Sequence, residues 1–214
     1  MNKLLTEAIG TFFLVLTVGL TVLAQTPFAP LAIGCSLMIM VYMGGHISGA
    51  HYNPAVTLAV LMRGTINSKD AVSYWIAQIA GALLAALAVR WIAGSTFAPA
   101  PAEGASIVAV LLVEILYTFA LALVMLNTAT APATAGNSYF GLAIGFTVVV
   151  GAFAGGPISG GAFNPAVGVG PILVSGAMSG GTMANLWYYL VGPLAGGALA
   201  AIVFRTQGVA APKA

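Results

Sequence analysis

Long uninterrupted runs of apolar residues dominate the chain. A helix needs roughly 20 mostly apolar residues to cross a bilayer. Six stretches meet this requirement: about 5–24, 30–48, 70–92, 106–126, 138–155 and 183–204. The pattern therefore predicts an all-α membrane protein with six membrane-spanning helices, organised as a single domain over residues 1–214.

Two further apolar stretches, about 54–62 and 165–173, are only half as long as a span. Each opens with the sequence Asn-Pro-Ala, at Asn53 and at Asn164. Asparagine is a favourable N-cap, and proline suits the first helical position because its missing N–H needs no partner there. Both stretches are therefore predicted to be short half-helices that begin at the proline of each motif.

The two halves of the chain, about 1–100 and 101–214, repeat one another. Three segments recur at one offset of 111 residues: Ala32-Ile33-Gly34 as Ala143-Ile144-Gly145, Gly44-Gly45-His46-Ile47-Ser48-Gly49 as Gly155-Gly156-Pro157-Ile158-Ser159-Gly160, and Asn53-Pro54-Ala55-Val56 as Asn164-Pro165-Ala166-Val167. Each half holds three spans, an odd number, so the halves cross the membrane in opposite directions as an inverted repeat. The half-helices then enter from opposite sides, and their N-termini are expected to meet near the midplane.

The loops that lead to the half-helices are expected to be non-helical backbone at membrane depth. Such backbone is tolerated where it lines a cavity. Glycines would let these loops turn and pack closely: Gly44, Gly45, Gly49, Gly155, Gly156, Gly160 and Gly161.

Composition agrees with a membrane protein and narrows the possible functions. Charged residues make up only 5% of the chain, against about 25% in a typical soluble domain. The formal net charge of +2 is too small to indicate a nucleic-acid partner. Cys35 is the single cysteine, so neither an internal disulfide nor a metal cluster is expected, and nothing indicates a cofactor.

Basic residues predict the orientation in the membrane. With six spans, most of them fall on one side: Lys3, Arg63, Lys69, Arg205 and Lys213. Only Arg90 falls near the other side. Because positive residues favour the cytoplasmic side, we expect both termini to be cytoplasmic and the chain to lie in the cell (inner) membrane. The N-terminal run to Ala24 could also be a signal peptide, but Glu7 near its start matches Glu114 at the start of the second half, which favours a span.

Six spans, an inverted repeat and paired Asn-Pro-Ala motifs resemble the aquaporin and glycerol-facilitator (major intrinsic protein) family. A single such motif is weak evidence, whereas two at one repeat offset, each opening a half-span, are very specific. The resemblance covers essentially the whole chain. It implies a homotetramer in the lipid bilayer, with a pore in each monomer that passes small uncharged solutes without any enzymatic activity.

The resemblance also implies roles for residues along the pore. Asn53 and Asn164 would donate side-chain N–H groups to solute at the midplane. Backbone carbonyls would form a polar ladder: Gly49, Ala50, His51, Gly160, Gly161 and Ala162. Independently, each helix N-terminus carries about half a positive charge, so two that face one another would repel cations and orient a solute's oxygen toward the asparagines.

The narrowest point of such pores is a four-residue filter, and here the chain departs from the family. The position after the second motif, where the family has arginine, is Val167. The remaining filter positions correspond to Ile33, Ala152 and Gly161. This filter has no charge, no side-chain donor and no aromatic ring, so it predicts a wider and more apolar constriction than that of a water-selective pore. It is similar to arginine-less bacterial members suspected of passing neutral arsenic hydroxides such as arsenite; glycerol is a second candidate, and a water-selective aquaporin is the alternative.

Two carboxylates inside predicted spans, Glu7 and Glu114, suggest function by default. They could relay protons in a secondary transporter, since such carriers also have inverted repeats. However, they lie on spans 1 and 4, away from the broken elements, so we expect them to brace the buried loops, and His46 to do the same. No catalytic set of side chains converges in the sequence, which disfavours an intramembrane enzyme. A purely structural family member stays possible, because an apolar filter could dewet and close.

Overall fold

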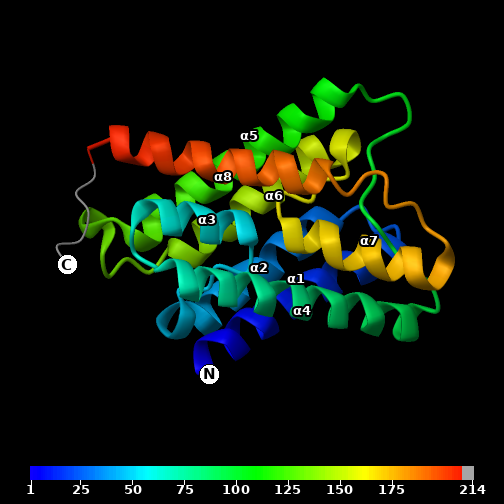
Figure 1. Cartoon of the computed structure of the whole chain (residues 1–214), viewed down its shortest axis with the longest axis horizontal. Coiled ribbons are helices and arrows are strands. Elements are labelled where there is room, and N and C mark those ends of the chain that lie inside the picture. The colour runs from blue at the N-terminus through cyan, green and yellow to red at the C-terminus, as the bar shows by residue number, and fades with distance from the viewer. Residues whose placement is uncertain (209–214) are drawn as a thin grey trace.

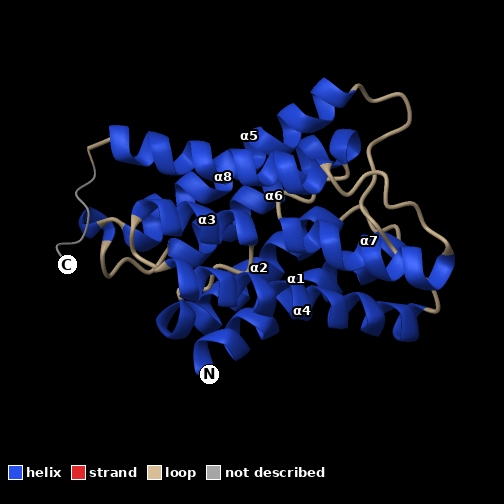
Figure 2. Ribbon diagram, in the orientation of Figure 1, coloured by secondary structure: helices blue, strands red, loops and turns tan. Residues whose placement is uncertain are grey.

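The computed structural model describes residues 1–208, and every regular element in that range is a helix (Figure 2). Six helices are long and apolar enough to cross a membrane: α1 (Asn2–Leu23), α2 (Ala29–Ser48), α4 (Ser68–Ala93), α5 (Ile107–Met125), α6 (Phe140–Ser159) and α8 (Tyr188–Thr206). Two shorter helices follow the Asn-Pro-Ala motifs, α3 (Pro54–Arg63) and α7 (Pro165–Ser179). The predicted fold class, six spans and two half-helices, is confirmed.

The long helices run side by side along the longest axis of the molecule, with α3 and α7 among them (Figure 1). Helix α1 packs on α4 and α5 packs on α8, while α2 crosses α6 between the two halves. Helices α3 and α7 meet near the middle, where the residues just before them hydrogen-bond across. We call the end that carries the start of α1 and the end of α8 the terminal face, and the other end the opposite face.

Side chains on the terminal face include most of the basic residues. Arg63 bonds to Thr130 and Arg205 bonds to the carbonyl of Met62, which places the ends of α3, α5 and α8 together. Lys3 lies at the same end, whereas Arg90 is in the last turn of α4, near the opposite face. Lys213 lies outside the described residues.

The crossing of α2 and α6 depends on two glycines at matching repeat positions. A Cβ added at Gly34 would lie 2.6 Å from the carbonyl oxygen of Gly145, and one added at Gly145 would lie 2.5 Å from the carbonyl oxygen of Gly34. The two backbones therefore touch, and no side chain fits between them.

We expect Gly145→Ala to destabilise the protein, because the new methyl group meets rigid backbone rather than a movable side chain. Overpacking of this kind costs about 1–3 kcal/mol. The thermal midpoint of the protein in detergent should fall clearly. The matched control is Gly156→Ala on the same helix, where an added Cβ has no neighbour within 4 Å; equal midpoints for the two variants would contradict this packing argument.

The non-helical loops are shorter than the glycine pattern predicts. Gly44 and Gly45 lie inside α2, and Gly155 and Gly156 lie inside α6. Both helices instead continue to a glycine C-cap in the left-handed conformation, with φ of 87° at Gly49 and 89° at Gly160. That conformation carries little cost only for glycine, so these two residues end the helices, while Gly44 and Gly155 allow close packing against neighbouring side chains.

Helix α7 extends to Ser179, beyond the predicted end near 173. Its last turns are held from outside the helix. The Thr96 hydroxyl lies 3.3 Å from Ser175 Oγ and 2.9 Å from Ser179 Oγ, so the connection between α4 and α5 stabilises them. The following span begins at Tyr188 rather than near 183.

Candidate functional site

Two five-residue segments, 49–53 and 160–164, connect each long helix to its half-helix and lie at the centre of the molecule. Both contain left-handed residues that are not glycine: φ is 52° at Ala50, 49° at Tyr52 and 49° at Phe163. Such conformations cost on the order of 1–3 kcal/mol each and persist only where the surroundings over-determine them. The surroundings here are two buried carboxylates.

Glu7 of α1 holds the first segment. Its side chain is fully buried, and its carboxylate accepts four hydrogen bonds: from Ser48 Oγ at 2.6 Å, His51 N at 3.0 Å, Tyr52 N at 2.7 Å and Gln78 Nε2 at 2.8 Å. Hydrogen bonds to a charged acceptor are about twice as strong as neutral ones. This carboxylate therefore offsets the strain of the segment and satisfies its N–H groups.

Glu114 of α5 does the same in the second half. It is also fully buried, and it accepts from Ser159 Oγ at 2.7 Å, Ala162 N at 3.1 Å and Phe163 N at 2.7 Å. Two tyrosines complete the symmetry, since Tyr74 donates to the carbonyl of Ser48 and Tyr189 donates to that of Ser159.

We expect Glu114→Gln to lower stability while leaving flux largely intact and nearly independent of pH. The amide has one acceptor oxygen, so the bond to Phe163 N is lost if the bonds to Ser159 and Ala162 are kept, and an unpaired buried donor costs about 1–3 kcal/mol. Thermal midpoints and solute flux across a pH series would measure both effects. Glu103→Gln, in the exposed connection between α4 and α5, is the control. Uphill, proton-driven uptake that Glu114→Gln abolishes would instead identify a carrier.

His46 does not brace the loops, so that prediction is wrong. Its side chain is exposed and makes no hydrogen bond within residues 1–208. Two residues later, Ser48 faces the interior instead, where it donates to Glu7 and accepts from Ala50 N at 3.0 Å. The helical rotation between 46 and 48 turns one side chain outward and the other inward.

The two asparagines of the motifs lie side by side at the centre. Each Oδ1 caps its own half-helix, at 2.8 Å from Ala55 N and 2.9 Å from Ala166 N. Each Nδ2 donates to the opposite half, with Asn53 bonding the carbonyl of Phe163 and Asn164 that of Tyr52, both at 2.9 Å. An amide nitrogen has two hydrogens, so one N–H of each asparagine stays available to a solute.

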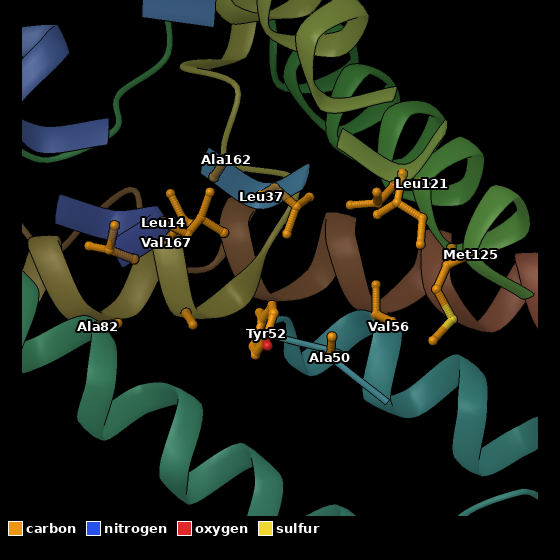
Figure 3. Close-up of a cluster of buried hydrophobic side chains, with 14 of the residues drawn as sticks. Leu14, Leu37, Ala50, Tyr52, Val56, Ala82, Leu121, Met125, Ala162 and Val167 are labelled. Atoms are coloured by element: carbon orange, nitrogen blue, oxygen red, sulfur yellow. The ribbon is translucent and has the colours of Figure 1, made fainter. Parts of the chain in front are cut away.

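A cavity of about 400 Å³, the central cavity, runs past these asparagines. Both of them line it, together with all four predicted filter residues: Ile33, Ala152, Gly161 and Val167. The structure thus brings the filter positions from α2, α6, the second loop and α7 to one space. Its other walls are mainly apolar, including Leu14, Leu37 and Leu121 (Figure 3).

The backbone of both loops lies along this path. Ala50, His51, Gly160, Gly161 and Ala162 line the central cavity. Among residues 1–208, no group of the chain donates to the carbonyl oxygens of these five residues. These oxygens are therefore free for a solute, as a polar ladder requires.

A second cavity of about 520 Å³, the terminal cavity, opens near the terminal face. It is lined by Gly49, by the exposed His46 and by polar groups of the connection between α5 and α6, such as Thr128 and Asn137. Among residues 1–208, only His51 and Met125 line both cavities. The two spaces therefore adjoin at these two side chains.

Sequence reasoning missed two parts of this lining. The segment 97–100, between α4 and α5, lines the central cavity because the Phe97 ring is seated beside Gly19, where an added Cβ would lie 2.4 Å from it. Met125 was missed because, in the sequence, it is one more apolar residue near the end of a predicted span. The only signals for them were the lack of a side chain at Gly19 and the polar run Asn127-Thr128 that follows α5.

Comparison with known proteins agrees with this geometry. Residues 1–204 match the model of the family described as Major intrinsic protein. The chain belongs to the major intrinsic protein family. It is accordingly a multi-pass membrane channel and not an enzyme.

Members of this family from plants and bacteria resemble the chain along most of its length. It is 38% identical over 206 residues to Aquaporin NIP1-1 of Zea mays, covering 92% of this chain and 71% of that protein. It is 36% identical over 222 residues to the glycerol uptake facilitator protein-like 6 of Lactiplantibacillus plantarum, covering 97% and 99%. Its fold matches the X-ray structure of the aquaglyceroporin from Plasmodium falciparum, with a TM-score of 0.82, 21% identity and coverage of 95% and 94%.

Proposed function

We propose that this channel passively conducts neutral solutes larger than water, with arsenite, its methylated forms and glycerol as leading substrates and with some water flux. The observation that carries the proposal is the chemistry of the four filter residues. None of them has a polar side chain, and Ala152 and Gly161 are among the smallest residues available.

An apolar wall changes the balance between water and larger solutes. A water molecule that enters it loses hydrogen bonds, and an unpaired polar group costs on the order of 1–3 kcal/mol. A larger solute such as glycerol also buries carbon atoms against Ile33 and Val167. This burial contributes a favourable free energy of about 25 cal/mol per Å² of apolar surface. Its hydroxyl groups can still reach the free carbonyls of the loops, on one side of an otherwise apolar tube.

The name of the Lactiplantibacillus relative supports glycerol, since that protein is 36% identical over 99% of its length and is called a glycerol uptake facilitator protein-like protein. Relatives called aquaporins, such as the one from Zea mays, make water the natural competitor. The solute panel below separates the two.

We also propose a homotetramer in the cell (inner) membrane with both termini cytoplasmic. Clustering of basic residues on the terminal face supports that orientation. Large apolar side chains cover the outside of the bundle, such as Leu84, Leu112 and Val150, and these suit contact with lipid or with a second copy.

Uptake into proteoliposomes, with arsenite and glycerol at rising concentrations, tests the proposal. A channel gives flux that does not saturate and does not depend on an ion gradient. Saturable, gradient-driven uptake would instead support a secondary transporter. Water flux without flux of either larger solute would support a water-selective aquaporin.

A further inference from the structure

The four filter residues do not separate the two cavities of this molecule. All four filter residues line one continuous cavity, the central cavity. The central and terminal cavities instead meet further toward the terminal face, where His51 and Met125 are the only residues of the described part of the chain that line both. Both side chains are nearly buried, with 6% and 3% of their surfaces exposed.

One wall of this junction is the buried imidazole of His51. His51 Nδ1 lies 3.1 Å from Thr57 Oγ1. The Thr57 hydroxyl donates its single hydrogen to the carbonyl of Asn53 at 3.1 Å and accepts from Gln78 Nε2 at 3.0 Å. With that hydrogen on Asn53, we assign Nδ1 as the donor toward Thr57, which leaves Nε2 as an acceptor.

The other wall is the flexible thioether of Met125. Figure 3 shows this side chain extending from the end of α5 toward the level of Val56. Methionine has three rotatable side-chain bonds and fills irregular gaps. The position of the Met125 side chain therefore depends on the backbone that carries it.

That backbone is unusual at this point. Helix α5 ends at Met125 and continues as a π-helix over Leu126–Thr130. π-helical turns are rare and frequently occur at functional sites. A wider turn rotates the residues that follow it relative to α5, and Met125 is the last α-helical residue before this change begins.

Arg63, the last residue of α3, holds the π-helical turn. Its Nε donates to Thr130 Oγ1 at 2.5 Å, and its Nη2 donates to the carbonyl of Thr130 at 2.6 Å. The guanidinium also stacks over the Phe204 ring, 4.8 Å from its centre, an arrangement in which the cation is attracted to the ring face. Only 7% of Arg63 is exposed, so the half-helix and the turn are fixed to each other.

We propose that His51 and Met125 form a second solute-selecting constriction, narrower than the outer filter, and that Arg63 acts as a positioning residue for Met125. This inference deepens the proposed function, on which it rests in taking the conducted species to be neutral solutes. At the constriction a solute donates a hydroxyl hydrogen to His51 Nε2 and places its carbon side against the thioether. This second constriction discriminates between solutes by size, because the four-residue filter is wide.

Met125→Ala tests the constriction. The ratio of glycerol to water permeability in proteoliposomes should rise by about threefold or more, since pore diameter and lining set selectivity. Leu121→Ala is the matched control, because it removes similar volume from the wall of the central cavity, one turn earlier on α5, and should leave the ratio nearly unchanged. Met125→Phe should lower the ratio while water flux persists. Equal ratios for the Met125→Ala and Leu121→Ala channels, or an unchanged ratio in a water-conducting Met125→Phe channel, would overturn the proposal.

Arg63 is tested through its dependence on Met125. Arg63→Met should shift the ratio, and Arg63→Lys should restore part of it because lysine can still donate to the carbonyl of Thr130. In the Met125→Ala background, Arg63→Met should have no further effect on the ratio, since coupled residues are not additive. An effect of equal size in both backgrounds would show that Arg63 does not act through Met125.

These outcomes separate the two proposals. If the unmodified channel passes glycerol and no Met125 variant alters the ratio, the constriction is wrong and the proposed function stands. If the unmodified channel excludes glycerol and Met125→Ala admits it, the proposed substrate is wrong and the constriction stands.

Discussion

Asn164→Asp should turn a cation-tight channel into one that conducts cations. The N-termini of α3 and α7 face each other at the asparagines, and each contributes about half a positive charge. A carboxylate there would cancel these charges. At about 4 Å and an effective dielectric constant near 20, the attraction to a cation is about 4 kcal/mol. Since each 1.4 kcal/mol is a factor of ten, cation flux could rise by about two to three orders of magnitude.

Controls for this experiment must separate charge from structural damage. Aspartate cannot donate to the carbonyl of Tyr52, so the bond that now measures 2.9 Å is lost. Asn164→Ala loses the same bond without adding charge and should stay cation-tight. Asn53→Asp should behave like Asn164→Asp, because the two asparagines make equivalent contacts. If both aspartate variants conduct water and exclude potassium, the helix ends are not the barrier to cations.

Val167→Arg should reduce the flux of glycerol and arsenite by about tenfold while reducing water flux much less. The long side chain would fill part of the central cavity, which Val167 now lines. Its charge needs hydrogen-bond partners when buried, and Gly160 and Gly161, whose carbonyls are free, line the same cavity. Water can exchange hydrogen bonds with the guanidinium, whereas a larger solute is excluded by size.

Val167→Met is the comparison for this effect, because it adds length without charge. It should reduce glycerol flux and also water flux, since a thioether returns no hydrogen bond to water. Stopped-flow light scattering on matched proteoliposomes gives both rates. A Val167→Arg channel that keeps glycerol flux at the unmodified level would refute the assignment of Val167 to the path of the solute.

The architecture was predictable from sequence because its signals are local or repeated. Span lengths follow from the apolar runs, and the paired motifs mark the starts of α3 and α7 through capping chemistry that does not depend on the rest of the fold. The ends of these elements were less predictable. Helix α7 continues to Ser179 because Thr96, some eighty residues away in sequence, lies within hydrogen-bond distance of its last turns.

The residues that line the pore likewise differ in whether the sequence predicts them. Positions such as Ile33 and Val167 are at fixed distances from a motif, and they do line the central cavity. Met125 is not marked by any motif, and the role that we propose for it depends on a π-helical turn that Arg63 holds from another helix. His46 does not brace the loops, because its helical phase on α2 turns it outward.

The most direct measurement is a stopped-flow experiment in which proteoliposomes are mixed with hypertonic glycerol. Water leaves first and the vesicles shrink. If the filter is as wide and apolar as proposed, glycerol then enters through the channel, and the vesicles reswell much faster than protein-free liposomes. Fast shrinking followed by reswelling no faster than in protein-free liposomes would show a water-selective pore and would contradict the account.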